Sequence, residues 1–226
     1  MKFLVLSRRS TIYSTRRLRD AARAEGHGCL VVDPLRCVLV LGEGRPSVRI
    51  AGEEITGIDA VIPRVGTYAV EYALAVVRQF EMTGVPALNG SAAIATAKNK
   101  WATMQLLMQR GIPVPPTATM RFGTHLKEVI RDLGGAPVVL KLPRGMQGAG
   151  VILSESAQGA ESTMDTVWAL GQDVMVQKFV SECRGMDLRV LVIGGEAVAA
   201  MRRTARDGEF RSNIHRGGAG RRAELT

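Results

Sequence analysis

Residues 138–151 read Val-Val-Leu-Lys-Leu-Pro-Arg-Gly-Met-Gln-Gly-Ala-Gly-Val, and this stretch decides the fold that we expect. Residues 138–142 are typical of a buried strand, which delivers Lys141 to a loop with glycines at 145, 148 and 150. Glycines let backbone N–H groups approach a polyphosphate closely, and a lysine at a strand end adds a point charge. The pattern therefore predicts a phosphate-covering hairpin. The alternative is a flexible hairpin with a solvated lysine.

The loop differs from the commoner phosphate-binding loops. It is not a Walker A loop, because no Lys-Ser or Lys-Thr follows the last glycine and the next segment is a predicted strand. The two polar segments that follow N-terminal strands, residues 7–10 and 63–66, contain no GxGxxG pattern, which argues against dinucleotide binding. A strand–loop–strand cover over phosphates is instead typical of kinases and ATP-grasp enzymes.

The segments around this loop predict an α+β domain with an antiparallel sheet under helices. A Gly-Gly pair at 194–195 between two apolar runs is a strong hairpin signal. The expected strands are residues 118–121, 138–142, 150–153, 174–179, 187–193 and 197–203. The expected helices are residues 101–110, 125–133 and 159–170.

The N-terminal part has a different rhythm, which predicts a small α/β unit with a parallel sheet. Strands are expected at residues 3–6, 29–32 and 60–62, with helices at 15–25 and 72–83. Parallel sheets bind ligands beyond the carboxyl ends of their strands, here residues 7–10 and 63–66. The small, polar segment 89–98 marks a boundary, so we expect domains at residues 1–95 and 96–226.

Charge and composition restrict the partners. The net charge is +9, but aromatic residues make up only 4% and do not alternate with basic ones, which argues against a nucleic-acid partner. Seven arginines lie between residues 202 and 222, against Asp207 and Glu209. Arginine suits bidentate binding of phosphate or carboxylate, so we expect a compact anion or an acidic tail as partner.

The apolar segments, the N-terminus and the cysteine content favour a cytoplasmic protein. No apolar stretch is long enough for a membrane span, and the N-terminus lacks the features of a signal peptide. The three cysteines, Cys29, Cys37 and Cys183, form no CxxC pair and suggest neither a zinc site nor a disulfide framework. We expect them to be small buried or half-buried thiols.

Three further groups of residues suggest binding chemistry. Lys100 lies directly before the predicted helix 101–110 and could aim a second ammonium at the same phosphates, or be part of a solvated helix start. Residues 177–180 end a strand whose backbone could read adenine, and Asp187 could bind ribose or be a turn residue. Residues 211–218, Arg-Ser-Asn-Ile-His-Arg-Gly-Gly, could neutralise charge at an acyl-transfer centre, or form a basic surface loop. His215 could act in acid–base chemistry or in positioning.

Taken together, these residues resemble the ATP-grasp superfamily, and closely resemble its RimK-like branch, over all 226 positions. The resemblance implies an α/β pre-ATP-grasp domain followed by an α+β ATP-grasp domain whose C-terminal part is missing. Residues 210–218 are the most specific part of the likeness, whereas the glycine loop alone would indicate only the superfamily. The other matching segments are residues 6–8, 13–14, 33–35, 59–66, 78–82 and 141–150.

The resemblance also implies a role for each matching residue. The expected catalytic residues are Arg202, Arg211, Asn213, His215 and Arg216. The expected nucleotide-binding residues are Lys100, Lys141, Gly145, Gln147 and Gly148 for the phosphates, Gln177, Lys178 and Phe179 for adenine, Asp187 for ribose, and Arg211, Ser212 and Asn213 beside the transferred phosphoryl group. Arg203 is expected with Arg202, His215 and Arg216 on the side of the acidic substrate.

Two departures from the family pattern matter. The linker position that is usually acidic is Lys178, which keeps a backbone hydrogen bond to adenine but loses a side-chain acceptor. The family's Mg²⁺ or Mn²⁺ ligands, a carboxylate and then a Glu-x-Asn, are expected beyond Thr226, and no Glu-x-Asn occurs in this sequence. We therefore expect these 226 residues alone to have little or no ligase activity while still holding nucleotide weakly.

The function implied by the resemblance is that of an ATP-dependent carboxylate–amine ligase acting through an acyl phosphate. It would add L-glutamate to the C-terminus of an acidic small-subunit ribosomal protein, or make polyglutamate, in the cytoplasm and as a homo-oligomer, expected to be a tetramer. The first alternative is a truncated, catalytically impaired nucleotide-binding homologue. A nucleic-acid binder is the second alternative.

Overall fold

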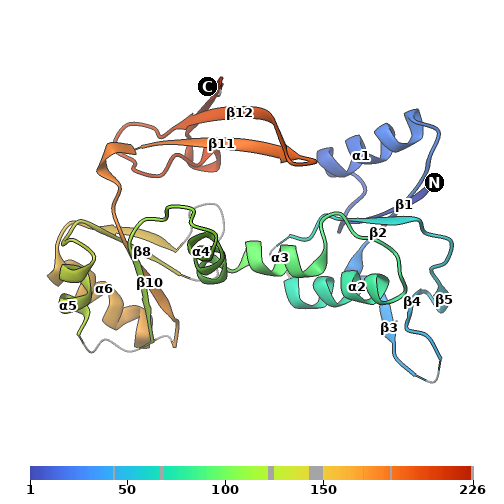
Figure 1. Ribbon diagram of the computed structural model, residues 1–226, viewed down its shortest axis with the longest axis horizontal. Helices are drawn as coiled ribbons and strands as arrows, with labels where there is room; N and C mark the ends of the chain where they lie inside the picture. The colour runs from blue at the N-terminus through green and yellow to red at the C-terminus, as the bar shows by residue number, and fades with distance from the viewer. Residues whose placement is uncertain are drawn as a thin grey trace. The chain divides into compact units, whose positions relative to one another are not determined.

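The computed structural model describes residues 1–42, 44–66, 69–121, 125–142, 150–169, 171–183 and 185–224 (Figure 1). Gly145, Gln147 and Gly148 of the predicted phosphate loop lie outside these residues. The chain forms two compact units, Met1–Lys98 and Asn99–Thr226. Among the described helices, none combines the length and the apolar character that crossing a membrane requires.

The first unit is built on a parallel sheet of three strands, as the sequence predicts. The strand order is β2 (Gly28–Val32), β1 (Lys2–Leu6), β6 (Ala60–Pro63), and both pairings are parallel. Helix α1 (Tyr13–Ala24) connects β1 to β2, and α2 (Val70–Met82) follows β6. This α/β arrangement brings the carboxyl ends of all three strands to one edge of the sheet.

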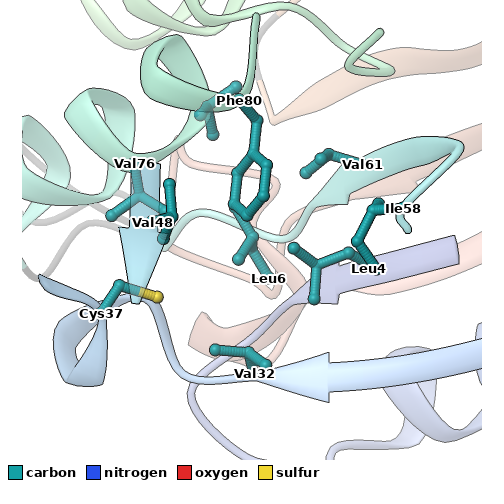
Figure 2. Close-up of a cluster of buried hydrophobic side chains, with 10 residues drawn as sticks. Leu4, Leu6, Val32, Cys37, Val48, Ile58, Val61, Val76 and Phe80 are labelled. Carbon is teal, nitrogen blue, oxygen red and sulfur yellow. The ribbon is translucent and has the colours of Figure 1, made fainter. Parts of the chain in front are cut away.

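Alternation along β1 explains how the sheet is covered on both faces. Leu4 and Leu6 are fully buried and pack with Val61, while α2 contributes Phe80 to the same cluster (Figure 2). Val5 points to the opposite face and is also fully buried. Helix α1 contacts β1 and β2. A strand that is apolar on both faces is typical of a parallel sheet between helices.

The first unit also contains several short elements that the sequence analysis did not predict. An antiparallel meander follows β2, and Gln79 of α2 holds it by donating from Nε2 to Val40 O at 2.8 Å and Ser47 O at 3.0 Å. The missed elements are η1 (Pro34–Arg36), β3 (Val38–Val40), β4 (Ser47–Ile50), β5 (Glu53–Glu54) and α3 (Ser91–Lys98). Strands of two to four residues are too short to show a period, and α3 lies in the segment where we expected the domain boundary.

The second unit contains a four-stranded antiparallel sheet under helices. Its order is β7 (Thr117–Met120), β10 (Val174–Lys178), β8 (Val138–Lys141), β9 (Val151–Ser154). The helices of this part are α4 (Lys100–Gln109), α5 (Leu126–Asp132) and α6 (Ala157–Ala169). Leu126, Ile130 and Met164 from α5 and α6 pack against Leu140 and Val176 of the sheet.

A second antiparallel sheet follows, where the sequence led us to expect only one. It contains β11 (Met186–Ile193), β12 (Glu196–Thr204) and β13 (Ala219–Arg222). The predicted hairpin at Gly194-Gly195 is confirmed, and both glycines have the positive φ that a tight two-residue turn requires, 63° and 89°. β13 was not among the expected strands. Two short 3₁₀ turns, η2 (Ser181–Cys183) and η3 (Ile214–Arg216), complete the unit.

The cysteines fit the expected role only in part. Cys37 is buried and Cys29 is half-buried, but Cys183 is exposed in η2, so its predicted burial is wrong. All three thiols are free.

The core of the second unit gives a stability prediction. Met164 of α6 is fully buried, whereas Met108 of α4 is 73% exposed. We expect Met164→Ala to lower the free energy of unfolding by about 2–5 kcal/mol, because it leaves a cavity among packed side chains. Urea unfolding followed by tryptophan fluorescence measures this, since Trp168 packs against the same core. Met108→Ala is the matched control and should change the free energy by less than about 0.5 kcal/mol. Equal losses in the two variants would contradict this packing.

Candidate functional site

Two lysines of the second unit meet at the end of β8. Lys141 is the last residue of β8, and its Nζ donates to Gln177 Oε1 at 2.5 Å. Lys100 is the first residue of α4, and its Nζ donates to Leu142 O at 3.1 Å. The helix starts there because the side chain of Asn99 accepts from Trp101 N at 3.0 Å and from the next backbone N–H. The structure therefore brings together the two lysines that we expected at the phosphates.

The lysine pair is electrostatically unfavourable without an anion. Burial lowers the pKa of Lys141, and the positive charge of Lys100 lowers it further. Burial also lowers the pKa of Lys100. Both shifts mean that the ammonium forms are destabilised by lost hydration and, for Lys141, by repulsion as well. A polyphosphate would offset both effects, because charge-assisted hydrogen bonds to phosphate oxygens replace water and neutralise the repulsion.

A chain of hydrogen bonds fixes the side chain beside Lys141. Gln177 is buried, with 7% of its surface exposed, and its Nε2 donates to Thr117 Oγ1 at 2.7 Å. The Thr117 hydroxyl in turn donates to Pro115 O at 2.7 Å. The sequence indicated a backbone role for Gln177. Its side-chain role and that of Thr117 were missed, because partners 60 residues apart leave no local signal.

The expected adenine-reading linker follows directly after Gln177. The Lys178 N–H donates to Pro116 O at 2.9 Å, and the Phe179 N–H donates to Pro137 O at 3.3 Å. Pro116 has no N–H and cannot donate back to the Lys178 carbonyl oxygen. The Lys178 side chain is exposed, while the Phe179 ring packs edge-to-face with Phe210, with ring centroids 6.4 Å apart.

Asp187, the expected ribose ligand, forms an ion pair across the β11–β12 hairpin. Arg203 lies directly opposite and donates from Nε to Oδ1 at 2.7 Å and from Nη2 to Oδ2. These hydrogen bonds hold the pKa of Asp187 below its ordinary value, against the opposing effect of burial, and Ser212 contributes a further hydrogen bond. Arg202 is the next residue along β12 and therefore points to the other face of the sheet, away from Arg203.

Arg211 is held by an acid that the sequence did not single out. Its Nε and Nη2 donate to the two carboxylate oxygens of Glu209 at 2.9 Å and 2.7 Å, and its Nη1 donates to Val151 O at 3.2 Å. The backbone N–H groups of Phe210 and Arg211 also donate to Glu209 Oε1. The Arg211 guanidinium is the main cause that lowers the pKa of Glu209 from 4.5 to about 2. The sequence did contain a signal for this ion pair, since Glu209 stands only two residues before the predicted catalytic Arg211.

Residues 212–218 form a tight turn beside β12. Ser212 is buried, Asn213 is half-buried and His215 is exposed. Arg216 Nε is buried, and among the described residues it has no hydrogen-bond partner. A Cβ on Gly218 would lie 2.7 Å from Ser212 O, so only glycine fits this close approach. The segment brings Ser212 and Asp187 together but leaves the His215 imidazole at the surface.

A cavity of about 460 Å³ lies next to the Glu209–Arg211 pair. It is lined by Leu153 and Glu155 at the end of β9, by Gly185 just before β11, and by residues 204–210 at the end of β12 and in the turn after it. The described part of the chain offers no cluster of three or more His, Cys, Asp or Glu residues that could hold a metal ion. The described donor set therefore does not fit the expected Mg²⁺ or Mn²⁺.

The first unit has polar groups at the ends of its parallel strands, where the sequence suggested a ligand. The hydroxyls of Ser7 and Thr15 are 2.8 Å apart and buried. Arg64, after β6, donates from Nη2 to Ser14 Oγ at 3.1 Å, and Lys98 Nζ donates to Gly66 O at 2.9 Å. These contacts connect α1 and α3 to the carboxyl edge of the sheet.

Comparisons with known proteins agree on one family. Residues 97–226 match the family model described as the RimK-like ATP-grasp domain, and residues 1–94 match the RimK PreATP-grasp domain. A relative from Thioalkalivibrio sulfidiphilus (strain HL-EbGR7), named "Probable alpha-L-glutamate ligase", is 47% identical over 226 residues, which are 100% of this chain and 75% of the relative. A relative of the same name from Syntrophotalea carbinolica is 45% identical over the same shares.

Solved structures support the same fold. A RimK domain protein ATP-grasp from Sphaerobacter thermophilus DSM 20745 is similar with a TM-score of 0.71 and 26% identity, over 92% of this chain and 76% of that one. The ATP-grasp ligase PsnB, complexed with a phosphomimetic variant of its minimal precursor, Mg and ADP, also gives a TM-score of 0.71. At 21% identity over 99% of this chain and 77% of that one, PsnB supports the fold alone.

The Glu209–Arg211 pair gives a pH-dependent stability prediction. Because the pKa of Glu209 is lowered on folding, the pair stabilises the protein above pH 4.5 and loses its effect as the pH falls towards about 2. We expect Glu209→Gln to lower the melting temperature by roughly 2–4 °C at pH 7, since such a pair contributes about 1 kcal/mol. The difference should shrink between pH 4.5 and pH 2, as measured by thermal unfolding.

Glu196→Gln is the control for this measurement, because Glu196 is an exposed carboxylate on β12. We expect it to leave the melting temperature unchanged at every pH. A Glu209→Gln difference that stayed constant down to pH 2 would show that the ion pair does not have the strength inferred here.

Proposed function

Because the chain belongs to the RimK-like ATP-grasp family, we propose that it is an ATP-dependent carboxylate–amine ligase that uses L-glutamate as its amine. The acceptor that we propose is the acidic C-terminus of a protein, with a small-subunit ribosomal protein as the first candidate, or a growing polyglutamate chain. The relatives named probable alpha-L-glutamate ligase support glutamate. The observation that carries the proposal is the partly buried Lys100–Lys141 pair at the end of β8.

The proposed phosphate site consists of this lysine pair and the loop that follows it. Two ammonium groups that repel one another in a partly dehydrated site are suited to the β- and γ-phosphates of ATP. In this proposal Gly145, Gln147 and Gly148, which lie outside the described residues, cover the phosphates through their backbone N–H groups.

The proposed nucleoside site lies around the end of β10 and the start of β11. We infer that the Lys178 carbonyl oxygen accepts a hydrogen bond from the adenine amino group, since Pro116 cannot donate to it. Gln177 and Phe179 flank this residue. Asp187 is proposed to accept from the ribose hydroxyls. Its oxygens keep lone pairs beyond those that Arg203 uses, so ribose need not displace the arginine.

The proposed reaction has two steps. An oxygen of the acceptor carboxylate attacks the γ-phosphorus of ATP, the bond to the bridging oxygen breaks, and ADP leaves as the acyl phosphate forms. The amine of glutamate then attacks the acyl carbon, loses a proton, and expels inorganic phosphate as the amide bond forms. Arg211, Ser212 and Asn213 are proposed beside the transferred phosphoryl group, where donors stabilise developing charge.

Basic groups of the last strands are proposed to bind the acidic acceptor. Arg202 and Arg221 lie directly opposite one another on β12 and β13 and are both exposed. Two like charges at such a position repel one another and favour an anion between them. His215 and Arg216 lie in η3, between β12 and β13, and within the described residues the Nε of Arg216 has no hydrogen-bond partner.

Mg²⁺ or Mn²⁺ remains part of the proposal because ATP-grasp enzymes bind ATP together with Mg²⁺. The described residues do not fit such an ion, so the steps above do not involve it. A cytoplasmic location and a homo-tetrameric assembly are likewise proposed from the family resemblance.

A glutamylation assay tests the proposed function. The protein, at the length that its gene encodes, is incubated with ATP, Mg²⁺, L-glutamate and an acidic peptide. We expect mass spectrometry to show glutamyl additions at the peptide C-terminus, with one ADP formed for each. We expect Lys141→Met to lower kcat/KM roughly 100-fold or more, because it removes a charged donor from the transferring phosphates. Lys127→Met is the control, since Lys127 pairs with Glu161 at the surface.

The possible outcomes separate the proposal from its alternative. Nucleotide binding without any ADP or glutamylated product would contradict the ligase and indicate a nucleotide-binding homologue. Full activity of Lys141→Met would show that the phosphates lie elsewhere.

A further inference from the structure

We propose that Gln177 is a positioning residue of the phosphate site, whose side-chain amide is locked in one orientation and holds the ammonium of Lys141 in place. This inference rests on the proposed function, because the ammonium is positioned for a polyphosphate. It assigns a role to the Gln177 side chain, to Thr117 and to the Pro115 carbonyl.

The three side chains lie on one face of the four-stranded sheet. Thr117 of β7 lies directly opposite Gln177 of β10, so both point to the same side. Lys141 of β8 lies opposite Met175, which is two residues before Gln177 and therefore shares its face. The register of β7, β10 and β8 thus places Thr117, Gln177 and Lys141 on one face in a diagonal row, because Val139 is the residue of β8 directly opposite Gln177.

The direction of each hydrogen bond in this row is fixed by chemistry at both ends. The Pro115 carbonyl can only accept, so the Thr117 hydroxyl donates to it and keeps its lone pairs for a donor. The Nε2 group of Gln177 fills that place at 2.7 Å. Oε1 must then point to the other side, where the Lys141 ammonium, a group that can only donate, lies 2.5 Å away. The amide orientation therefore follows from the groups around it.

A neutral amide suits this position better than a carboxylate would. Burial and the charge of Lys100 both disfavour the ammonium form of Lys141, and a hydrogen-bond acceptor beside it stabilises that charged form. The carbonyl oxygen of Gln177 supplies that acceptor without cancelling the positive charge. Two N–H groups of the ammonium remain for phosphate oxygens. A glutamate in place of Gln177 would form an ion pair with Lys141 and compete with the phosphates.

The positioning role is tested first in the protein without nucleotide. Competitive labelling with an amine-reactive reagent, read by mass spectrometry, reports how much of each lysine is in the free amine form. Loss of the Oε1 acceptor destabilises the ammonium, so we expect Gln177→Met to label Lys141 about three- to tenfold faster. Thr117→Val, which releases the amide, should act in the same direction, and Thr117→Ser should restore the wild-type rate.

Two internal controls make this measurement specific. Thr119→Val removes a hydroxyl on the same strand and the same face that donates to Val174 O and takes no part in the Thr117–Gln177–Lys141 hydrogen bonds, so it should leave the Lys141 rate unchanged. Lys127, in its surface ion pair with Glu161, should label equally in all variants. If Lys141 labels at the wild-type rate in both Gln177→Met and Thr117→Val, the inference is overturned.

The second measurement compares nucleotides that differ in their phosphates. Calorimetric titration with ADP and AMP should show that Gln177→Glu weakens ADP binding about tenfold or more, because the added carboxylate neutralises Lys141. AMP binding should change by less than about twofold, since the β-phosphate is absent. A purely structural defect would weaken both nucleotides equally, and that result would overturn the inference.

The two readouts also distinguish this inference from the proposed function. If the wild-type chain binds ADP and AMP equally while the labelling results hold, the lysine is positioned and the proposed polyphosphate site is wrong. If ADP is preferred and the Gln177 variants keep that preference, the phosphate site stands and the role of Gln177 is refuted.

Discussion

The constraint on which the site depends is that two ammonium groups are held close together and partly out of water. Burial lowers the pKa of both Lys100 and Lys141, which means that the ammonium form of each lysine is less stable in the folded protein than in water. A fold keeps such an arrangement only if its surroundings hold the side chains firmly. The structure supplies this through Leu142 O for Lys100 and Gln177 Oε1 for Lys141.

The fold explains why the backbone that carries Lys100 and Lys141 is held in place. Lys141 ends a strand whose preceding residues, Val138, Val139 and Leu140, are buried, so its backbone cannot shift without disturbing the core. Its neighbour β10 is anchored by Val174 and Val176, which are packed in the same cluster as Leu140. Lys100 is set by the Asn99 cap of α4. The positioning of charge is thus a consequence of apolar packing beneath the sheet.

Much of this architecture could be predicted from the sequence, for identifiable reasons. The strand that delivers Lys141 and the Gly194-Gly195 hairpin have strong local signals, a continuous apolar run and a pair of residues that readily adopt positive φ. The resemblance to the RimK-like branch added the family, which the comparisons confirm. The meander β3–β5 and strand β13 were missed, because two to four residues carry too little pattern to distinguish a strand from a loop.

The site was harder to predict than the fold, because its decisive contacts join distant positions. Thr117 and Gln177 are 60 residues apart, and nothing near either residue indicates that they bond to one another. The engagement of Asp187 by Arg203 depends on the register of a hairpin, which the sequence indicates without fixing the pairing. Glu209 lies only two residues from Arg211, yet its role becomes visible only when its two oxygens are seen against the guanidinium.

The most direct test of the central claim is a crystal structure of this chain with ADP bound. The account predicts that phosphate oxygens lie within about 2.7–3.2 Å of both the Lys100 and the Lys141 Nζ atoms. It also predicts that Lys141 keeps its hydrogen bond to Gln177. A diphosphate bound away from the end of β8, with neither lysine in contact with it, would contradict the account.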